Sequence, residues 1–517
     1  MTAAAARATS NGSVAGSLRS GMPFEGPLCS LTGAAYPRPR KGRDGWMGGV
    51  NARETSVVIL GGGPGGYEAA LVAAHLGAKV TVVDRDGLGG AAVLTDCVPS
   101  KALISTADFM SQFETASDLG VHLEDHEGDE VADSVAEIVA VNQRVLRLAA
   151  AQSRDIGARL DSDGVRVLRG AGRLVSPSQV RAELEDGGTE DLAADVVLVA
   201  TGATPRVMAS AQPDGERILT WQQIYSLKEL PEKLVVVGSG VTGAELAQAY
   251  LGLGADVTLV SSRDRVLPGE DADAATVIEE VFRKRGMEVL DRSRMAAVER
   301  TADGVVVRLE DGRVVEGSHA LLAVGSIPQT AGLGLEEVGV TLKESGHVVV
   351  DRVSRTSVRG VYAAGDCTGV LPLASVAAMQ GRIAMAHALG DAVVPLNLRA
   401  VSANIFTDPE IATVGYSQKD VDEGRVDAAA LMLPLATNPR AKMQGITDGF
   451  VKLFARKGIG TVVGGVVVAP KASELIYPVT LAVQHGLTVD QLAGTFTVYP
   501  SLSGSIAEAA RQLHDPQ

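Results

Sequence analysis

Two glycine-rich segments are the parts of this 517-residue chain whose residue types and spacing most directly indicate chemistry. The first follows the apolar run 57–60 in G-x-G-x-x-G spacing, and its glycines are Gly61, Gly63 and Gly66. In this arrangement the first glycine allows a tight turn, the second lets the backbone approach a pyrophosphate, and the third lets a helix pack closely on a strand. The next apolar run, 80–83, ends in Asp84, whose carboxylate can bind ribose hydroxyls. We therefore predict a dinucleotide site here.

The same pattern occurs a second time, with its glycines at Gly238, Gly240 and Gly243. Two such units predict two bound dinucleotides, brought together so that a hydride can pass between them. No carboxylate follows the second unit, where the chain reads Ser261, Ser262 and Arg263. Arg263 could meet the 2′-phosphate of NADPH, and a simple solvated arginine is the alternative.

The composition argues against several other classes of protein. A net charge of −15 and a pI of about 5.1 disfavour a nucleic-acid surface, which needs clustered lysine and arginine. No apolar run approaches the roughly 18 residues of a membrane span, so we expect no integral membrane segment. The three cysteines, Cys29, Cys97 and Cys367, form neither a disulfide framework nor a metal-binding pattern. We therefore expect a reducing compartment, the cytoplasm, and no metal site.

The elements that hold these segments follow from the apolar periodicity. Helices are expected at about 102–117 and 131–160, and strands between 164 and 200. A later strand ends in Gly325, and another apolar run ends in Gly365 and Asp366 and is followed by a helix to about residue 396. Beyond 397 the prolines and mixed elements indicate a separate domain.

Residues 1–52 differ from the rest of the chain. They are rich in Ala, Ser, Gly, Pro and Arg and show no periodicity, so we expect a disordered tail. The tail lacks the apolar core of a secretory signal. An organelle transit peptide and a start codon placed too far upstream, with Met47 as the other start, are the alternatives.

The whole set of motifs resembles the flavoprotein disulfide reductases. The motifs are, in order, GGGPGG, CVPSK, ATG, GSGVTG, AAGD and TDPEIATVG, and the match runs from about residue 55 to residue 511. The resemblance implies an α/β fold with two Rossmann-like domains, which bind FAD and NAD(P), and a C-terminal α+β dimerisation domain. The expected divisions are a tail at 1–52, an FAD-binding domain at 53–205, an NAD(P)-binding domain at 206–328, a central domain completing the FAD site at 329–396 and a dimerisation domain at 397–517.

The resemblance also implies roles for single residues. Lys101 should lie beside the flavin ring and pair with Glu245, and Asp366 should bind the ribityl and phosphate region of FAD. The other cofactor-binding positions that we expect are Gly172, Thr201, Gly202, Gly325 and Gly365.

Three departures from the family decide the expected function. Ala92 stands at the first position of the family's cysteine pair, so only Cys97 remains, whereas a dithiol relay needs two sulfurs. Tyr499 and Gly504 stand at the positions of the histidine and glutamate that form the family's base dyad. Gln380 stands where relatives often carry glutamate.

The same pattern resembles the quinone-reducing members of the family, of the mycobacterial LpdA type. We therefore predict a homodimeric, FAD-dependent NAD(P)H:quinone oxidoreductase with NADPH as donor and NADH also accepted. Lys101 would stabilise negative charge at the reduced flavin, and Glu245 would hold Lys101. Tyr499 would donate a hydrogen bond to the quinone, or merely fill the space of the lost dyad. The alternatives are a pyridine-nucleotide transhydrogenase, a dihydrolipoamide dehydrogenase-like protein without disulfide reductase activity, a flavin-bound interaction module and a single-thiol enzyme using Cys97.

Overall fold

The computed structural model describes residues 55–114, 116, 120–121 and 136–514. The tail predicted at 1–52 lies outside these residues, as does part of the helix predicted at 131–160. Within the described part of the chain, no helix is long and apolar enough to cross a bilayer.

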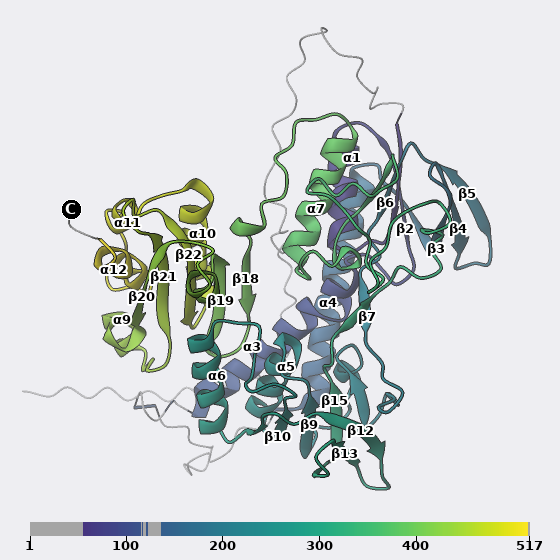
Figure 1. Cartoon of the computed structure of the whole chain (residues 1–517). Coiled ribbons are helices and arrows are strands. Elements are labelled where there is room, and N and C mark those ends of the chain that lie inside the picture. The colour runs from purple at the N-terminus through teal and green to yellow at the C-terminus, as the bar shows by residue number, and fades with distance from the viewer. Residues whose placement is uncertain (1–54, 115, 117–119, 122–135, 515–517) are drawn as a thin grey trace, which may run out of the picture. The chain divides into compact units, whose positions relative to one another are not determined.

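The first sheet carries the first glycine motif. Its seven strands run in the order β17-β6-β1-β2-β3-β4-β5, and all neighbours as far as β3 are parallel, whereas β3, β4 and β5 pair antiparallel. Helices α1 and α7 lie side by side in Figure 1. The elements are β1 (Ser56–Leu60), α1 (Pro64–His75), β2 (Lys79–Asp84), β3 (Arg166–Ser176), β4 (Gln179–Leu184), β5 (Thr189–Ala193), β6 (Val196–Val199), β17 (Val361–Ala363) and α7 (Ala374–Ala388). The central strands are runs of valine, isoleucine and leucine because a parallel sheet is buried on both faces.

The second sheet repeats this plan around the second glycine motif. Its five strands are all parallel, in the order β11-β10-β9-β15-β8, and an antiparallel sheet of β12, β13 and β14 accompanies them. The elements are β8 (Ile218–Thr220), η2 (Ile224–Ser226), β9 (Lys233–Val237), α5 (Val241–Gly252), β10 (Asp256–Val260), α6 (Ala272–Lys284), β11 (Glu288–Leu290), β12 (Met295–Arg300), β13 (Val305–Leu309), β14 (Val314–Gly317) and β15 (His319–Leu322). A two-stranded ribbon, β7 (Ala203–Pro205) with β16 (Ser326–Pro328), joins this part of the chain to the first sheet.

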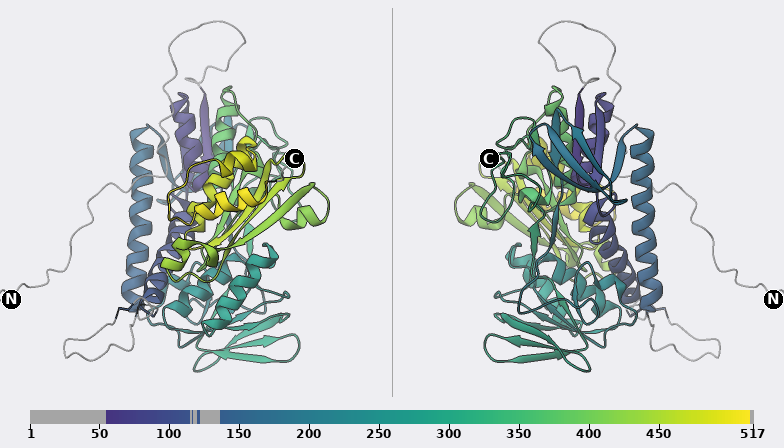
Figure 2. Two further views of the ribbon diagram at one scale, coloured as in Figure 1. Left: turned by 90° about the vertical axis from the view of Figure 1, so that its left-hand side faces the viewer. Right: turned by 90° about the vertical axis from the view of Figure 1, so that its right-hand side faces the viewer.

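Three helices follow the first glycine motif. They are α2 (Gly90–Leu94), α3 (Cys97–Glu114) and α4 (Ile138–Ser162). Figure 2 shows α3 and α4 side by side. Helix α3 also packs on α5, so it connects the loop around Cys97 with the second glycine motif.

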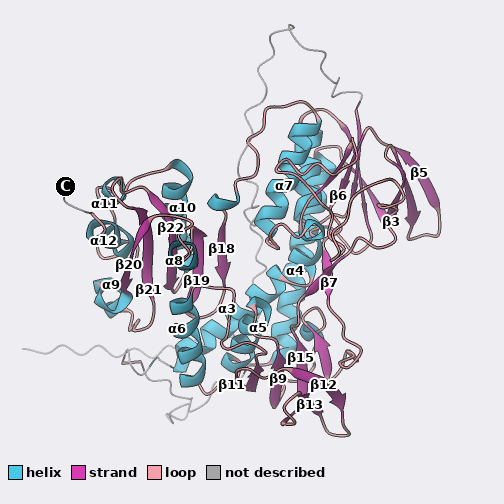
Figure 3. Cartoon of the chain, viewed as in Figure 1, coloured by secondary structure: helices cyan, strands magenta, loops and turns pink. Residues whose placement is uncertain are grey.

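The C-terminal part is an antiparallel sheet with helices, drawn by secondary structure in Figure 3. Its strand order is β18-β19-β22-β21-β20, and α10 packs on the central strands β19 and β22. The elements are η4 (Leu398–Ala400), β18 (Ser402–Ile405), β19 (Glu410–Gly415), α8 (Gln418–Asp422), β20 (Ala428–Pro434), η5 (Leu435–Thr437), α9 (Pro439–Met443), β21 (Phe450–Arg456), β22 (Val462–Ala469), α10 (Ala472–His485), α11 (Val489–Ala493) and α12 (Gly504–Gln512). This arrangement agrees with the predicted α+β domain.

One predicted element is too long. The helix expected to reach about residue 396 ends at Ala388, and 391–397 form neither helix nor strand. Gly390 takes a left-handed conformation, with φ of 80°, which stops the helix. Pro395 then excludes a restart, because it lacks the backbone N–H that a helix needs.

Candidate active site

Each glycine motif contains two glycines that the fold itself requires. Gly61 has a φ of 101°, and a Cβ atom there would lie 2.4 Å from the carbonyl oxygen of Ala200. A Cβ atom on Gly66 would lie 1.9 Å from the carbonyl oxygen of Gly61. These positions exclude a side chain because β1, α1 and β6 meet there.

The second motif has the same geometry. Gly238 has a φ of 112°, and a Cβ atom there would lie 2.3 Å from the carbonyl oxygen of Ala323. A Cβ atom on Gly243 would lie 1.8 Å from the carbonyl oxygen of Gly238. The two motifs are therefore equivalent turns on two sheets.

The middle glycine of each motif is different, because nothing in the protein requires it. A Cβ atom on Gly240 would meet no atom within 4 Å, and one on Gly63 would meet only Gly90 Cα at 3.9 Å. Each glycine immediately precedes a helix of 12 residues, where free N–H groups attract phosphate. The open space over these two glycines fits a pyrophosphate in contact with the backbone.

Asp84 at the end of β2 is a buried residue that holds the first glycine loop. Its carboxylate accepts hydrogen bonds from the backbone N–H groups of Gly62, at 2.7 Å, and of Gly87. A carboxylate has more acceptor positions than these two donors fill, so it can also accept a hydrogen bond from a ribose hydroxyl.

The three residues after β10 lie at different depths. Ser261 is fully buried, and its hydroxyl bonds to the Ser239 hydroxyl at 2.7 Å and accepts from the Arg263 N–H at 3.2 Å. Ser261 therefore shapes the loop from beneath, whereas Ser262 and Arg263 are exposed. Arg265, which the sequence analysis did not select, lies beside them with a buried Nε that has no hydrogen-bond partner within the described residues.

Of the other predicted cofactor-binding residues, Thr201 and Gly202 follow β6, Gly365 and Asp366 follow β17, and Gly325 follows β15 of the second sheet. Thr201 donates its hydroxyl to the carbonyl of Gln329 at 2.6 Å. Gly202 and Gly325 take left-handed conformations, with φ of 70° and 94°. Gly172 lies in β3, where a Cβ atom would meet the end of the buried Leu60 side chain at 2.5 Å, so packing favours a glycine there.

Gln380 holds the loop that contains Asp366. Its amide oxygen accepts a hydrogen bond from the Gly365 N–H at 2.9 Å, and the whole side chain is buried. Burial also raises the pKa of Asp366. A glutamate at position 380 would add a second buried negative charge to this loop, so the neutral amide suits the site.

The predicted pair of Lys101 and Glu245 is present. Lys101 Nζ donates to Glu245 Oε2 at 2.8 Å, and Glu245 is buried. The other carboxylate oxygen accepts from the Phe406 N–H at 2.9 Å, and Lys101 Nζ lies 4.8 Å from the centre of the Phe406 ring. Burial lowers the pKa of Lys101, but the acidic groups around it, Glu245 first among them, together outweigh that effect, and the net shift is upward. Lys101 is therefore a fixed cation.

Cys97 begins helix α3 and is a free thiol. The only other free cysteine in the described residues, Cys367, is fully buried and donates to the Ala364 carbonyl. Burial, followed by the neighbouring Asp96 carboxylate, raises the pKa of the Cys97 thiol to about 12. The protonated form is a poor nucleophile, so the geometry argues against the single-thiol alternative.

Asp96 is a second carboxyl group that the sequence analysis missed. It directly precedes α3 and interacts electrostatically with Lys101, Glu245 and Asp366. Burial raises its pKa to about 6, while Lys101 opposes that shift. Asp96 is the only charged residue in the sequence AAVLTDC, residues 91–97, and this isolated charge could have drawn attention to it.

Tyr499 lies between α11 and α12 with 82% of its surface exposed. Phe496 and Val498 beside it are exposed as well. The aromatic ring is therefore free to contact a ligand or another protein chain.

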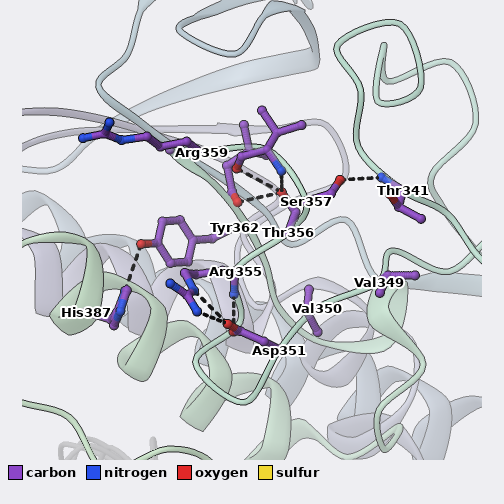
Figure 4. Close-up of a pocket in the computed structure, with 13 residues that line it drawn as sticks. Thr341, Val349, Val350, Asp351, Arg355, Thr356, Ser357, Arg359, Tyr362 and His387 are labelled. Carbon is purple, nitrogen blue, oxygen red and sulfur yellow. Dashed lines mark hydrogen bonds and ion pairs between the residues drawn. The ribbon is translucent and has the colours of Figure 1, made fainter.

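A hollow with a volume of about 720 Å³ lies elsewhere in the chain. It is drawn in Figure 4, where Tyr362 meets His387 Nδ1 at 3.0 Å and Arg355 pairs with Asp351. None of the predicted site residues lines it. It is therefore separate from the two glycine turns. No cluster of metal-binding side chains occurs among the residues with described positions.

Comparison with known proteins agrees with this geometry. Residues 55–381 match the family model described as pyridine nucleotide-disulphide oxidoreductase, and residues 401–510 match the dimerisation domain of the same family.

The chain belongs to this family of oxidoreductases.

Its relatives include a Mycobacterium tuberculosis protein named NAD(P)H dehydrogenase (quinone), which is 57% identical over 472 residues, or 89% of this chain and 94% of the relative. Dihydrolipoyl dehydrogenase of Bacillus subtilis is 33% identical over 461 residues, or 88% of this chain and 96% of the relative. The crystal structure of LpdA from Mycobacterium tuberculosis superimposes with a TM-score of 0.85 at 56% identity, covering 89% of this chain and all of that one. Members of this family bind FAD and NAD(P)H, and the two open glycine turns fit both dinucleotides.

Proposed function

We propose that this protein transfers electrons from NAD(P)H through bound FAD to a quinone. The observation that carries the proposal is the combination of two intact glycine turns with a single sulfur, Cys97, at the start of α3. A disulfide relay requires a second sulfur, so a direct acceptor is needed. The name of the mycobacterial relative supports a quinone as that acceptor. When bound, FAD supplies the redox chemistry, by taking up a hydride and returning two electrons.

The chain's own residues would supply position and charge. We assign Lys101 to stabilise the negative charge that builds up when the cofactor is reduced, because its ammonium group is a fixed cation. Glu245 would hold that cation in place, and the Phe406 N–H would hold Glu245. We propose that the other residues predicted from the sequence to bind a cofactor do so. Ser261 and Gly172 are the exceptions, because they would shape the backbone of the site without touching the cofactor.

The acceptor site would be completed by a second copy of the chain. The dimerisation domain at 401–510 supports a homodimer. In such a dimer the exposed Tyr499 would reach the side of the partner's FAD site at which the quinone binds. Its ring can stack on a flat quinone there, and its hydroxyl can donate a hydrogen bond. We also propose that the chain is divided into the five parts predicted from the sequence. We propose the cytoplasm as its compartment.

Donor choice follows from the loop after β10. Arg263 is exposed, and the Nε of the nearby Arg265 is buried without a hydrogen-bond partner among the described residues, so this loop can accept a 2′-phosphate. We therefore propose NADPH as donor, with NADH also accepted.

The experiment is a turnover assay of the FAD-loaded protein with a panel of acceptors. NADPH oxidation with a soluble quinone should be rapid, whereas lipoamide and glutathione disulfide should give negligible turnover. Rapid turnover of either disulfide, or none of the quinone, would refute the proposal. A thio-NAD analogue in the same panel tests the transhydrogenase alternative, and NADH in place of NADPH tests donor choice.

A further inference from the structure

Gln248 is a buried residue on α5 to which the proposed function gives no role. Its side chain is 7% exposed, and both of its polar atoms bond to the backbone of a single residue, Asp408. The amide N–H donates to the Asp408 carbonyl at 2.9 Å, and the amide oxygen accepts from the Asp408 N–H, also at 2.9 Å. Two opposed hydrogen bonds to one residue fix both the place and the direction of the chain at Asp408.

The segment that Gln248 holds also contacts the pair of Lys101 and Glu245. This segment, 406–409, joins β18 to β19. The Phe406 N–H donates to Glu245 Oε1 at 2.9 Å, and the Phe406 ring centre lies 4.8 Å from Lys101 Nζ. Glu245 and Gln248 stand three residues apart on α5 and so share one face of the helix. Each of them accepts a hydrogen bond from a backbone N–H of the same short segment.

Three parts of the chain meet at this contact. Lys101 lies on α3 after the first glycine motif, and Glu245 and Gln248 lie on α5, which begins at the second. The segment 406–409 belongs to the residues that match the dimerisation domain. One oxygen of Glu245 accepts from Lys101 at 2.8 Å, and the other accepts from the Phe406 N–H. Rotation of the carboxylate would break one of these bonds, so the place of the ammonium group depends on the place of the Phe406 N–H.

We propose that Gln248 is a positioning residue for the cation beside the flavin. By holding Asp408, it keeps the Phe406 N–H on Glu245, and Glu245 in turn keeps the Lys101 ammonium group in one place. A cation that is already in place stabilises developing negative charge without first having to be oriented. The dimerisation domain thereby helps to set how readily bound FAD is reduced. This inference rests on the role that the proposed function gives to Lys101.

The test measures the midpoint reduction potential of the FAD-loaded protein, which needs neither quinone nor turnover. Gln248→Leu replaces the amide by an apolar side chain of similar size, so Asp408 loses both hydrogen bonds. The equilibrium constant for reduction of the bound FAD should fall at least tenfold, a drop of about 30 mV for a two-electron couple. Gln248→Asn keeps the amide but is one methylene too short to reach Asp408, and it should show the same drop if the apolar variant folds poorly.

A double-mutant cycle separates positioning from general damage. Lys101→Gln removes the cation and should lower the potential by itself. Adding Gln248→Leu to Lys101→Gln should cause no further drop, because the group that Gln248 positions is then absent. Arg285→Ala is the matched control: Arg285 also bonds to Asp408, at 2.6 Å, but through the side-chain carboxylate, and both side chains are about one-third exposed. Its potential should equal that of wild type.

Two results overturn the proposal. A wild-type potential in the FAD-loaded Gln248→Leu and Gln248→Asn variants would show that Lys101 does not depend on Gln248. An equal drop from Gln248→Leu in the presence and in the absence of Lys101 would make Gln248 a structural residue only. Failure of the proposed function is distinguishable, because a wild type that cannot reduce quinone still has a potential that these variants shift or leave unchanged.

Discussion

Cys97 is the one sulfur that remains of the family's cysteine pair, because Ala92 stands at the other position. Its thiol is held protonated by burial and by the adjacent Asp96 carboxylate, so it cannot act as a thiolate at neutral pH. Cys97→Ser should therefore keep quinone reduction within about tenfold of wild type, or about 1.4 kcal/mol of barrier. Steady-state kinetics with NADPH and a soluble quinone measure this. A larger loss would restore the single-thiol alternative.

Asp96 also makes a prediction for the stability of the folded chain. Its folded pKa of about 6 lies above the ordinary 3.8, so the folded state binds the proton more tightly than the unfolded state does. The stabilisation is complete below pH 3.8 and is lost as pH rises through about 6. Asp96→Asn should therefore gain stability relative to wild type across this window, by on the order of 2 kcal/mol. Denaturant unfolding of the FAD-free protein at several pH values measures the difference, and a difference that does not vary with pH would contradict it.

Sequence reasoning reached some of these residues and missed others for physical reasons. The ion pair of Lys101 and Glu245 was expected from the resemblance and is present. The Phe406 N–H that fixes Glu245 could not be predicted, because a backbone donor leaves no trace in residue types. Asp96 was missed because an aspartate before a helix is usually only a cap, and the charged groups that act on it come from segments far apart in the sequence.

The two glycine turns carry the argument at the scale of secondary structure. Gly63 and Gly240 have extended backbones and open space above them, so a larger side chain there should fold but fill the pyrophosphate position. Gly240→Val should weaken NADPH binding at least tenfold, about 1.4 kcal/mol, while FAD stays bound. Gly63→Val should instead lose FAD.

Titration calorimetry with NADP⁺ and the flavin content of the purified variants measure the two effects. Gly269→Val is the matched control, because a Cβ atom there also meets nothing within 4 Å but lies outside both turns. Normal binding of both cofactors in Gly63→Val and Gly240→Val would contradict the assignment of the turns.

The positions of strands were easier to predict than helix ends. Runs such as β1 and β9 are apolar throughout because both faces of a parallel sheet are covered, and that pattern is legible in the sequence. The end of α7 was misplaced by eight residues, from about 396 to 388, because the apolar residues after Gly390 continue the pattern of the helix. Only the left-handed conformation of Gly390 shows where the helix stops.

At the scale of the molecule, a buried ion pair joins the C-terminal sheet to the second nucleotide-binding unit. Lys452 on β21 is 3% exposed and donates to both oxygens of Asp271, at 2.9 Å each, just before α6. Lys452→Met would leave the Asp271 charge buried without its partner, at a cost of about 3–5 kcal/mol in unfolding free energy.

Lys457→Met is the matched control for that prediction. Lys457 lies just after the same strand and pairs with Asp427 at 3.1 Å, but both side chains are exposed. Its loss should cost less than about 1 kcal/mol. Equal stability of the two variants in urea denaturation would show that the buried pair does not join these parts of the chain.

The central claim for the whole molecule is that electrons pass from NAD(P)H to a quinone without a thiol relay. The most direct measurement is double-mixing stopped flow on the FAD-loaded Cys97→Ser variant, followed by flavin absorbance. NADPH should bleach the flavin, and a soluble quinone should restore its absorbance in a single fast step, at a rate within about tenfold of wild type. A reduced variant that quinone cannot reoxidise, beside a wild type that it can, would contradict the account.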